Sequence, residues 1–174
     1  MLPEIKNKLD SMDQSLEKLI DHLNKLGPEE LHKRVADEWS PAQVFQHLHD
    51  SEWGTLGYLK KKMQAPANEV QTGGLEAKLR SFMLNRALKS KKKKFRAPKI
   101  LSNLPDRPDY NALKAHYPKV RSGLRELLSS VDHTNLNKTY FKHPRAGRIT
   151  FLQTLSFLDL HFKRHFEQII ERSS

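Results

Sequence analysis

Two histidines, His161 and His165, stand four residues apart in the segment DLHFKRHFEQII, which covers residues 159 to 170 and has a helical pattern. Residues spaced this way lie on one face of a helix with their Cβ atoms about 6 Å apart, so both imidazoles can bind one metal ion. Spacing alone is weak evidence in a chain that contains nine histidines. A usual metal site would also need a third ligand.

A second histidine pair, His47 and His49 in the segment FQHLHD, offers that third ligand. Residues two apart on a helix face different ways, so at most one of them can join His161 and His165. Periodicity does not choose between the two. Three neutral imidazoles leave a divalent ion its full charge and an open position, which is the pattern of catalytic sites. Zn²⁺ and Ni²⁺ both suit such ligands, and either would activate a bound water or thiol.

The other histidines have no such pattern. Four have no partner at ligand spacing and are expected to be solvated: His22, His32, His116 and His133. His143 precedes Pro144 in a loop-like segment and is expected to be a turn or cap residue. Carboxylates often fix the orientation of a ligand histidine. Three lie close enough in sequence to do so: Asp50, Glu52 and Asp159.

Helices must position these side chains, and the sequence predicts four long ones. Residues 4 to 26 carry apolar side chains at alternating steps of four and three, and LGP at 26 to 28 ends the stripe. A second helix should run from Ser40 to about Gln64, since Ser40, Pro41 and Gln43 form a capping box with proline at the first helical position.

The third and fourth helices follow a long connection between Pro66 and Pro108, which contains a shorter helix near 75 to 91. The third covers roughly 109 to 131, and Pro118 inside it predicts a kink or a late start. After a loop from 132 to 149, Thr150 and Gln153 form the capping box of the fourth. The sequence therefore predicts an all-α four-helix bundle, a single domain over 1–174, with a long crossover between the second and third core helices.

Composition excludes several kinds of chemistry. The chain has no cysteine, so disulfides and thiolate ligands are absent and any thiol must come from outside. No apolar run approaches the roughly 20 residues of a membrane span. The first residues lack the basic and apolar regions of a signal peptide, so we expect a cytoplasmic protein without membrane contact.

The formal net charge of +11 is concentrated in one strip, residues 86–99, which supplies +8 and has no acidic residue. Its Lys91–Lys94 run, followed by Phe95 and Arg96, could contact phosphates and stack a base, as in a nucleic-acid-binding protein. A solvated strip at a helix end is the favoured interpretation, because basic residues there also complement the helix dipole. The strip could instead attract an anionic substrate, or serve a metal-free interaction module.

Two long segments, EWSPAQVFQHLHDSE (38–52) and HPRAGRITFLQTLSFLDLHFKRHFEQI (143–169), resemble the DinB-like, YfiT-related superfamily of small metal-binding four-helix proteins. This family is unrelated to the DNA polymerase of similar name. Its pattern has Trp-Ser, a ligand histidine eight residues after the tryptophan, and a closing His-x3-His helix with a following Gln-Ile pair. The matching positions are Trp39, His47, His161, His165 and the Gln168–Ile169 pair, and the FRAP segment at 95–98 also agrees.

The resemblance implies a metal site formed by His47, His161 and His165. It leaves His49 at the surface or behind a ligand, and it places Arg164, where many relatives have another histidine, off the site. Better-understood relatives resemble thiol transferases, in which the metal activates a small thiol such as bacillithiol, mycothiol or glutathione. Others are described as metal-dependent hydrolases, and many form homodimers. We therefore expect a metal-dependent transferase or hydrolase acting on a small molecule; the alternative is nucleic-acid binding or metal-free interaction through residues 86–99.

Overall fold

Residues 1–36, 38–90 and 103–173 are described by the computed structural model. The Lys91–Lys94 run and the FRAP segment, on which the sequence analysis drew, lie outside these described residues. Four long helices form the bundle: α1 (Pro3–Leu23), α3 (Pro41–Lys62), α6 (Tyr110–Ser129) and α8 (Phe151–Arg172). The predicted all-α fold is confirmed.

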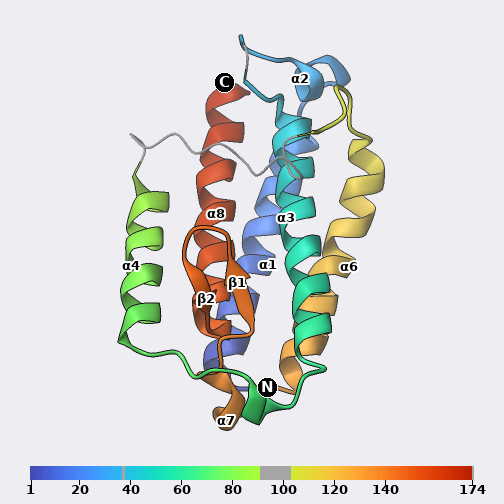
Figure 1. Cartoon of the computed structure of the whole chain (residues 1–174). Coiled ribbons are helices and arrows are strands. Elements are labelled where there is room, and N and C mark those ends of the chain that lie inside the picture. The colour runs from blue at the N-terminus through green and yellow to red at the C-terminus, as the bar shows by residue number, and fades with distance from the viewer. Residues whose placement is uncertain (37, 91–102, 174) are drawn as a thin grey trace.

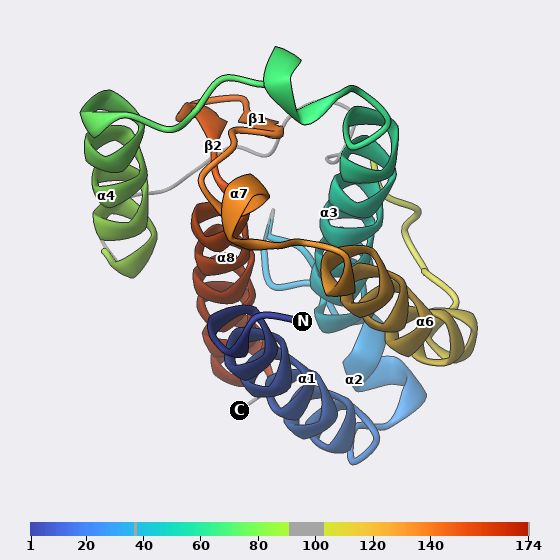
Figure 2. The same ribbon diagram turned by 90° about the horizontal axis from the view of Figure 1, so that it is seen from below.

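The four helices are arranged in a ring, in which α1 contacts α8, α8 contacts α3, α3 contacts α6 and α6 contacts α1 (Figures 1 and 2). Helices α1 and α8 run in one direction, and α3 and α6 run in the other. Two consecutive core helices, α3 and α6, are therefore parallel, and only a long connection can join them. Within that connection lie the 3₁₀ turn η1 (Ala67–Glu69) and α4 (Leu75–Lys89), which packs on the outside of α8. The predicted crossover is thus present.

Local side-chain bonds fix where two of the core helices begin. Ser40 Oγ accepts the Gln43 N–H at 3.2 Å, and Gln43 Oε1 accepts the Ser40 N–H at 3.1 Å. Thr150 and Gln153 repeat this capping box at the start of α8, with distances of 3.4 and 2.9 Å. Both boxes agree with the sequence-based prediction, because a capping box depends only on residues three apart.

Other boundaries differ from the prediction. Helix α1 ends at Leu23, and the short α2 (Pro28–His32) follows it. Helix α6 begins at Tyr110 and contains Pro118 in its interior, so the late start considered for this helix is wrong. Pro118 is exposed, which lets water reach the carbonyl that proline leaves without an N–H partner.

The segment expected to be a loop, residues 132–149, contains α7 (His133–Leu136) and a small antiparallel hairpin, so that expectation is wrong. Strands β1 (Phe141–His143) and β2 (Gly147–Ile149) pair with Phe141 opposite Ile149 and His143 opposite Gly147. Gly147 adopts a φ of +65°, which favours glycine, and the inward residues Phe141 and Ile149 join the core. The hairpin contacts α3 and α4 close to the start of α8. Among the described residues, no helix is long and apolar enough to cross a membrane.

Candidate metal centre

Three histidines from two neighbouring helices meet near one end of the bundle. His47 lies in the second turn of α3, His161 lies at the middle of α8, and His165 lies one turn later. Because α3 and α8 are antiparallel neighbours, an early residue of one faces a late residue of the other (Figure 1). One ligand nitrogen from each of the three rings lies within 4.8 Å of the others.

The distances between these rings suit coordination of one ion. The Nε2 atoms of His47 and His161 are 3.2 Å apart. Two nitrogens bound to one tetrahedral Zn²⁺ at 2.0–2.1 Å would be separated by about 3.3 Å. The ring centroids are 5.1 Å apart for His47 and His161, 4.9 Å for His47 and His165, and 4.6 Å for His161 and His165. The trio therefore needs little rearrangement to bind a metal.

Electrostatics keep two of these imidazoles neutral. Burial holds the pKa of His161 well below its usual 6.5, and the neighbouring His165 and His47 lower it further. Burial, followed by the nearby His47, lowers the pKa of His165 to about 3, and Gln168 partly opposes this effect. Since only a neutral imidazole has a lone pair for a metal, both rings are in the ligand form at neutral pH.

Neighbouring side chains orient the rings. Gln168 Oε1 lies 2.7 Å from Nδ1 of His165, and because an amide oxygen only accepts, Nδ1 carries the proton and Nε2 is left for an ion. The ring centroids of Trp39 and His47 are 4.9 Å apart, and those of Phe157 and His161 are 5.5 Å apart, so each ligand ring packs against an aromatic side chain. Sequence analysis identified Gln168 only as part of a motif, and its acceptor role became visible only in the structure.

The three carboxylates expected behind the ligands are engaged elsewhere, so that prediction is wrong. Asp50 Oδ1 lies 2.8 Å from Nδ1 of His49. Glu52 is buried, pairs with Arg121 and accepts the Tyr117 hydroxyl at 2.8 Å. Asp159 pairs with two lysines, Lys8 and Lys163, at 3.0 Å each. Proximity in sequence did not identify the partners because each carboxylate pairs with side chains outside the trio: Asp50 with its neighbours on α3, Glu52 with α6, and Asp159 with lysines of α1 and α8.

His49 points away from the trio, as the two-residue spacing from His47 requires. It is only 5% exposed, and its Nε2 lies 2.8 Å from Nδ1 of His116 on α6. The surface position considered for His49 is therefore wrong. His116 is exposed, as expected, although it has a spatial partner in His49 that sequence spacing did not indicate.

The remaining histidines have varied surroundings. His22 Nε2 lies 2.7 Å from the Ser173 hydroxyl, and His32 is half-buried, so neither is simply solvated. His133 is exposed, as expected. His143 is buried and accepts the N–H groups of Arg145 at 3.1 Å and Ala146 at 3.0 Å, which confirms its predicted role as a turn residue.

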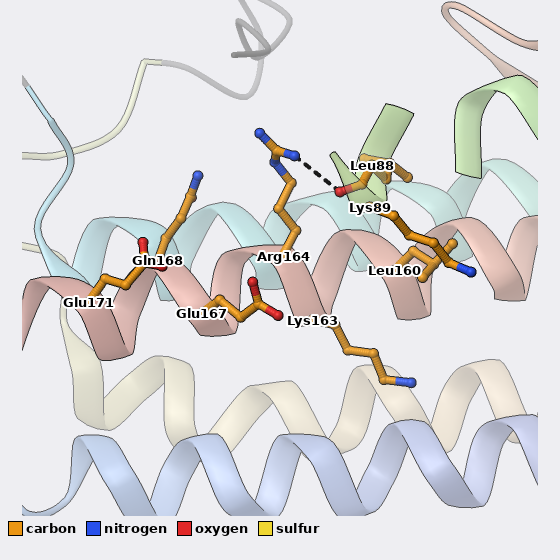
Figure 3. A pocket seen from close by; sticks show the side chains of 8 residues that line it. All are labelled: Leu88, Lys89, Leu160, Lys163, Arg164, Glu167, Gln168 and Glu171. Carbon is orange, nitrogen blue, oxygen red and sulfur yellow. Dashed lines mark hydrogen bonds between the residues drawn. The ribbon is translucent and has the colours of Figure 1, made fainter. Parts of the chain in front are cut away.

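A cavity of about 260 Å³ lies between α8 and the end of α4, and none of the three histidines lines it. Arg164 lines it and donates to the carbonyl oxygen of Leu88 at 3.0 Å (Figure 3). It also donates to the carbonyl oxygen of Ser90 at 2.8 Å, so it points towards the end of α4 and off the metal site, as predicted. The lining residues are Leu88, Lys89, Leu160, Lys163, Arg164, Glu167, Gln168 and Glu171. Gln168 links this cavity to His165.

Comparison with known proteins agrees with the earlier resemblance. A family model described as the DinB superfamily matches residues 11–169. The chain is 26% identical over 153 residues to the uncharacterized protein YuaE of Bacillus subtilis (strain 168), covering 87% of this chain and 88% of that protein. No solved structure gives a significant match.

Proposed function

Because the chain belongs to the DinB superfamily, we propose that it is a metal-dependent enzyme in which His47, His161 and His165 hold a divalent ion. The observation that carries this proposal is the convergence of one nitrogen from each ring within 4.8 Å. A small-molecule substrate would bind beside them.

The donor set fits a catalytic ion. Three imidazoles supply three nitrogen ligands and leave at least one position open, and Zn²⁺ and Ni²⁺ are the ions such a set favours. When bound, the ion would make a coordinated water or thiol more acidic. The protein's own contribution is to keep the imidazoles of His161 and His165 neutral by burial, and to fix the His165 tautomer through Gln168.

We propose an external small thiol as the nucleophile for transfer to an electrophile, with water as the alternative in a hydrolase. The chain has no cysteine that could serve instead. Lys89, Lys163 and Arg164 line the cavity that Gln168 links to His165, and they outnumber Glu167 and Glu171, which also line it, so the lining is net positive. An anionic thiol is the co-substrate that this field favours.

Metal analysis tests the metal site directly. Untagged protein should contain about one Zn or Ni per chain by elemental analysis, and His161→Ala/His165→Ala should lose it. His133→Ala is the matched control, because His133 is exposed on the short α7, and it should keep the metal. Retention of metal by the double variant, or no uptake of Zn²⁺ and Ni²⁺ by the wild type, would overturn the proposal.

Salt dependence tests the nature of the substrate. If positive charge attracts an anionic thiol, its KM should rise as ionic strength increases, because salt screens exposed charges beyond about 10 Å at 0.1 M. The value of kcat should change little. A KM that is independent of salt would contradict an anionic co-substrate, and tight DNA binding that requires the Lys91–Lys94 run would favour the nucleic-acid alternative.

Assembly and location are further parts of this proposal. From the family resemblance we expect a single-domain chain that forms a homodimer in the cytoplasm. Light scattering on the purified protein measures the oligomeric state, and a monomer at micromolar concentration would contradict the dimer.

A further inference from the structure

A second histidine pair lies between α3 and α6, on the opposite side of α3 from the trio. His49 Nε2 and His116 Nδ1 are 2.8 Å apart, and the two rings are tilted by 58° with centroids 5.1 Å apart. His49 is 5% exposed, whereas His116 is open to solvent. The family resemblance gave neither residue a ligand role.

The contacts behind His49 are those of a ligand histidine. Asp50 Oδ1 lies 2.8 Å from His49 Nδ1 and also accepts a hydrogen bond from Gln46 Nε2 at 2.7 Å. A carboxylate only accepts, so the His49 proton is on Nδ1 and the Nε2 lone pair faces His116. Metal-binding histidines commonly donate their second ring nitrogen to a carboxylate in this way. At the trio, by contrast, an amide takes this place behind His165.

The pair is accessible from outside. Trp53 packs beside both rings, with centroids 6.0 Å from His49 and 5.8 Å from His116, and 57% of its surface is exposed. An ion can therefore approach from solvent past Trp53 and the exposed His116. Water would complete its coordination, because the two imidazoles supply only two ligands.

We propose that His49 and His116 form a second site for a divalent transition-metal ion. Two nitrogen ligands at this spacing need to separate by only a few tenths of an ångström to bind one ion. The site is weaker than a three-histidine site and prefers Cu²⁺ over Ni²⁺ and Zn²⁺, following the usual order for nitrogen ligands. The chain thus has a capacity of two ions, held on opposite sides of α3.

The two tryptophans of the chain allow each site to be observed separately. Trp39 packs against His47 of the trio, and Trp53 packs against the His49–His116 pair. In a Trp39→Phe variant, Trp53 is the single tryptophan. Cu²⁺ bound at the pair should quench its fluorescence at this short distance.

The experiment titrates Cu²⁺ into Trp39→Phe protein whose trio has been removed by His161→Ala/His165→Ala. We expect a saturable quench of Trp53 with one ion per chain, and affinity at least about tenfold weaker after His116→Ala or Asp50→Asn. His133→Ala is the control for a surface histidine away from the pair. Far-UV circular dichroism and the melting temperature show whether each variant remains folded.

Two outcomes would overturn the second site: the absence of a saturable quench, or a quench that is unchanged by His116→Ala. Because the trio is deleted in this background, failure here leaves the three-histidine proposal untouched. Conversely, if the trio bound no metal, the quenching of Trp53 fluorescence by Cu²⁺ at the His49–His116 pair would be unchanged.

Discussion

At the scale of single residues, hydrogen bonds behind the histidines determine which ring nitrogen is free to bind a metal. Gln168 accepts a hydrogen bond from Nδ1–H of His165, and Asp50 accepts one from Nδ1–H of His49. Both contacts leave the Nε2 lone pair available for an ion, although the two acceptors differ in charge. The ligand role of each imidazole thus depends on a neighbour that is not itself a ligand.

Gln168→Leu removes the acceptor behind His165 and should weaken metal binding at the trio by about 10- to 100-fold. Gln168→Glu keeps an acceptor and should hold the metal at least as tightly as the wild type. Competition with a chelator of known affinity measures both. Gln64→Leu, at an exposed glutamine, serves as the control; equal affinity in Gln168→Leu and the wild type would show that the contact has no role in metal binding.

His143 should make stability depend on pH. Burial, and then the Arg145 charge, lower the pKa of His143 to about 4 in the folded protein, whereas an unfolded histidine titrates near 6.5. The unfolded state therefore binds more protons between these values, so the contribution is complete above pH 6.5 and is lost as pH falls towards about 4. We expect the loss to be about 3 kcal/mol.

The matched variant is His143→Asn, whose side-chain oxygen can still accept the N–H groups of Arg145 and Ala146. This variant should keep most of the wild-type free energy of unfolding at pH 7.5, and that free energy should fall less steeply than in the wild type between pH 6.5 and 4. Urea denaturation of the metal-loaded protein at several pH values measures the difference. The same slope in both proteins would show that His143 is not the titrating group.

At the scale of elements, α3 and α6 approach so closely that one of their glycines cannot be replaced by a larger residue without a clash. A Cβ at Gly123 of α6 would lie 2.9 Å from Leu56 Cδ2, on a buried side chain of α3. A Cβ at Gly57 of α3 would have no atom within 4 Å. The contact that places His49 beside His116 therefore depends on a small residue in α6 and not on the glycine in α3.

Gly57→Ala should raise the free energy of unfolding by about 0.5–1 kcal/mol, because alanine favours the helix and meets open space. Gly123→Ala has the same propensity gain but crowds Leu56, so it should be less stable than Gly57→Ala by at least about 1 kcal/mol. Thermal denaturation of the two variants provides the comparison. If Gly123→Ala were more stable than Gly57→Ala, the Leu56 side chain must move aside at little cost, and the close approach of α3 and α6 would not require glycine at position 123.

At the scale of the whole molecule, one buried ion pair connects three of the four core helices. Arg121 of α6 donates to both carboxylate oxygens of Glu52 on α3, and its Nη1 lies 3.6 Å from Asp13 of α1. Tyr117 donates to the same carboxylate, and burial raises its pKa well above 10. Burial lowers the pKa of Arg121, but the Glu52 carboxylate and Tyr117 together raise it by more, so the guanidinium stays charged inside the core.

Arg121→Met should lower the free energy of unfolding by about 3–5 kcal/mol, because it leaves the Glu52 carboxylate buried without its charge partner. Adding Glu52→Leu should recover most of this loss, since replacing both members of a buried pair is often close to neutral. Guanidinium denaturation of the single and double variants measures the coupling. If the double variant is no more stable than Arg121→Met, the pair is not the cause of the loss.

The sequence alone determined the features that depend on residues within about four positions of one another. The capping boxes at Ser40 and Thr150, the apolar stripe of α1 and the shared face of His161 and His165 are all local, because helical geometry relates neighbours directly. From these features the all-α bundle followed, and the family motifs added His47 as the third histidine.

Only the tertiary structure decided which distant side chains meet. His47 and His161 are 114 positions apart and His49 and His116 are 67 apart, so helix packing, not local periodicity, brings each pair together. The partners of Asp50, Glu52 and Asp159, and the hairpin of residues 141–149, also escaped prediction. The partners that Glu52 and Asp159 reach on α6 and α1 depend on how helices pack in the ring, because burial and shape complementarity over the whole core set that packing and no short segment encodes it.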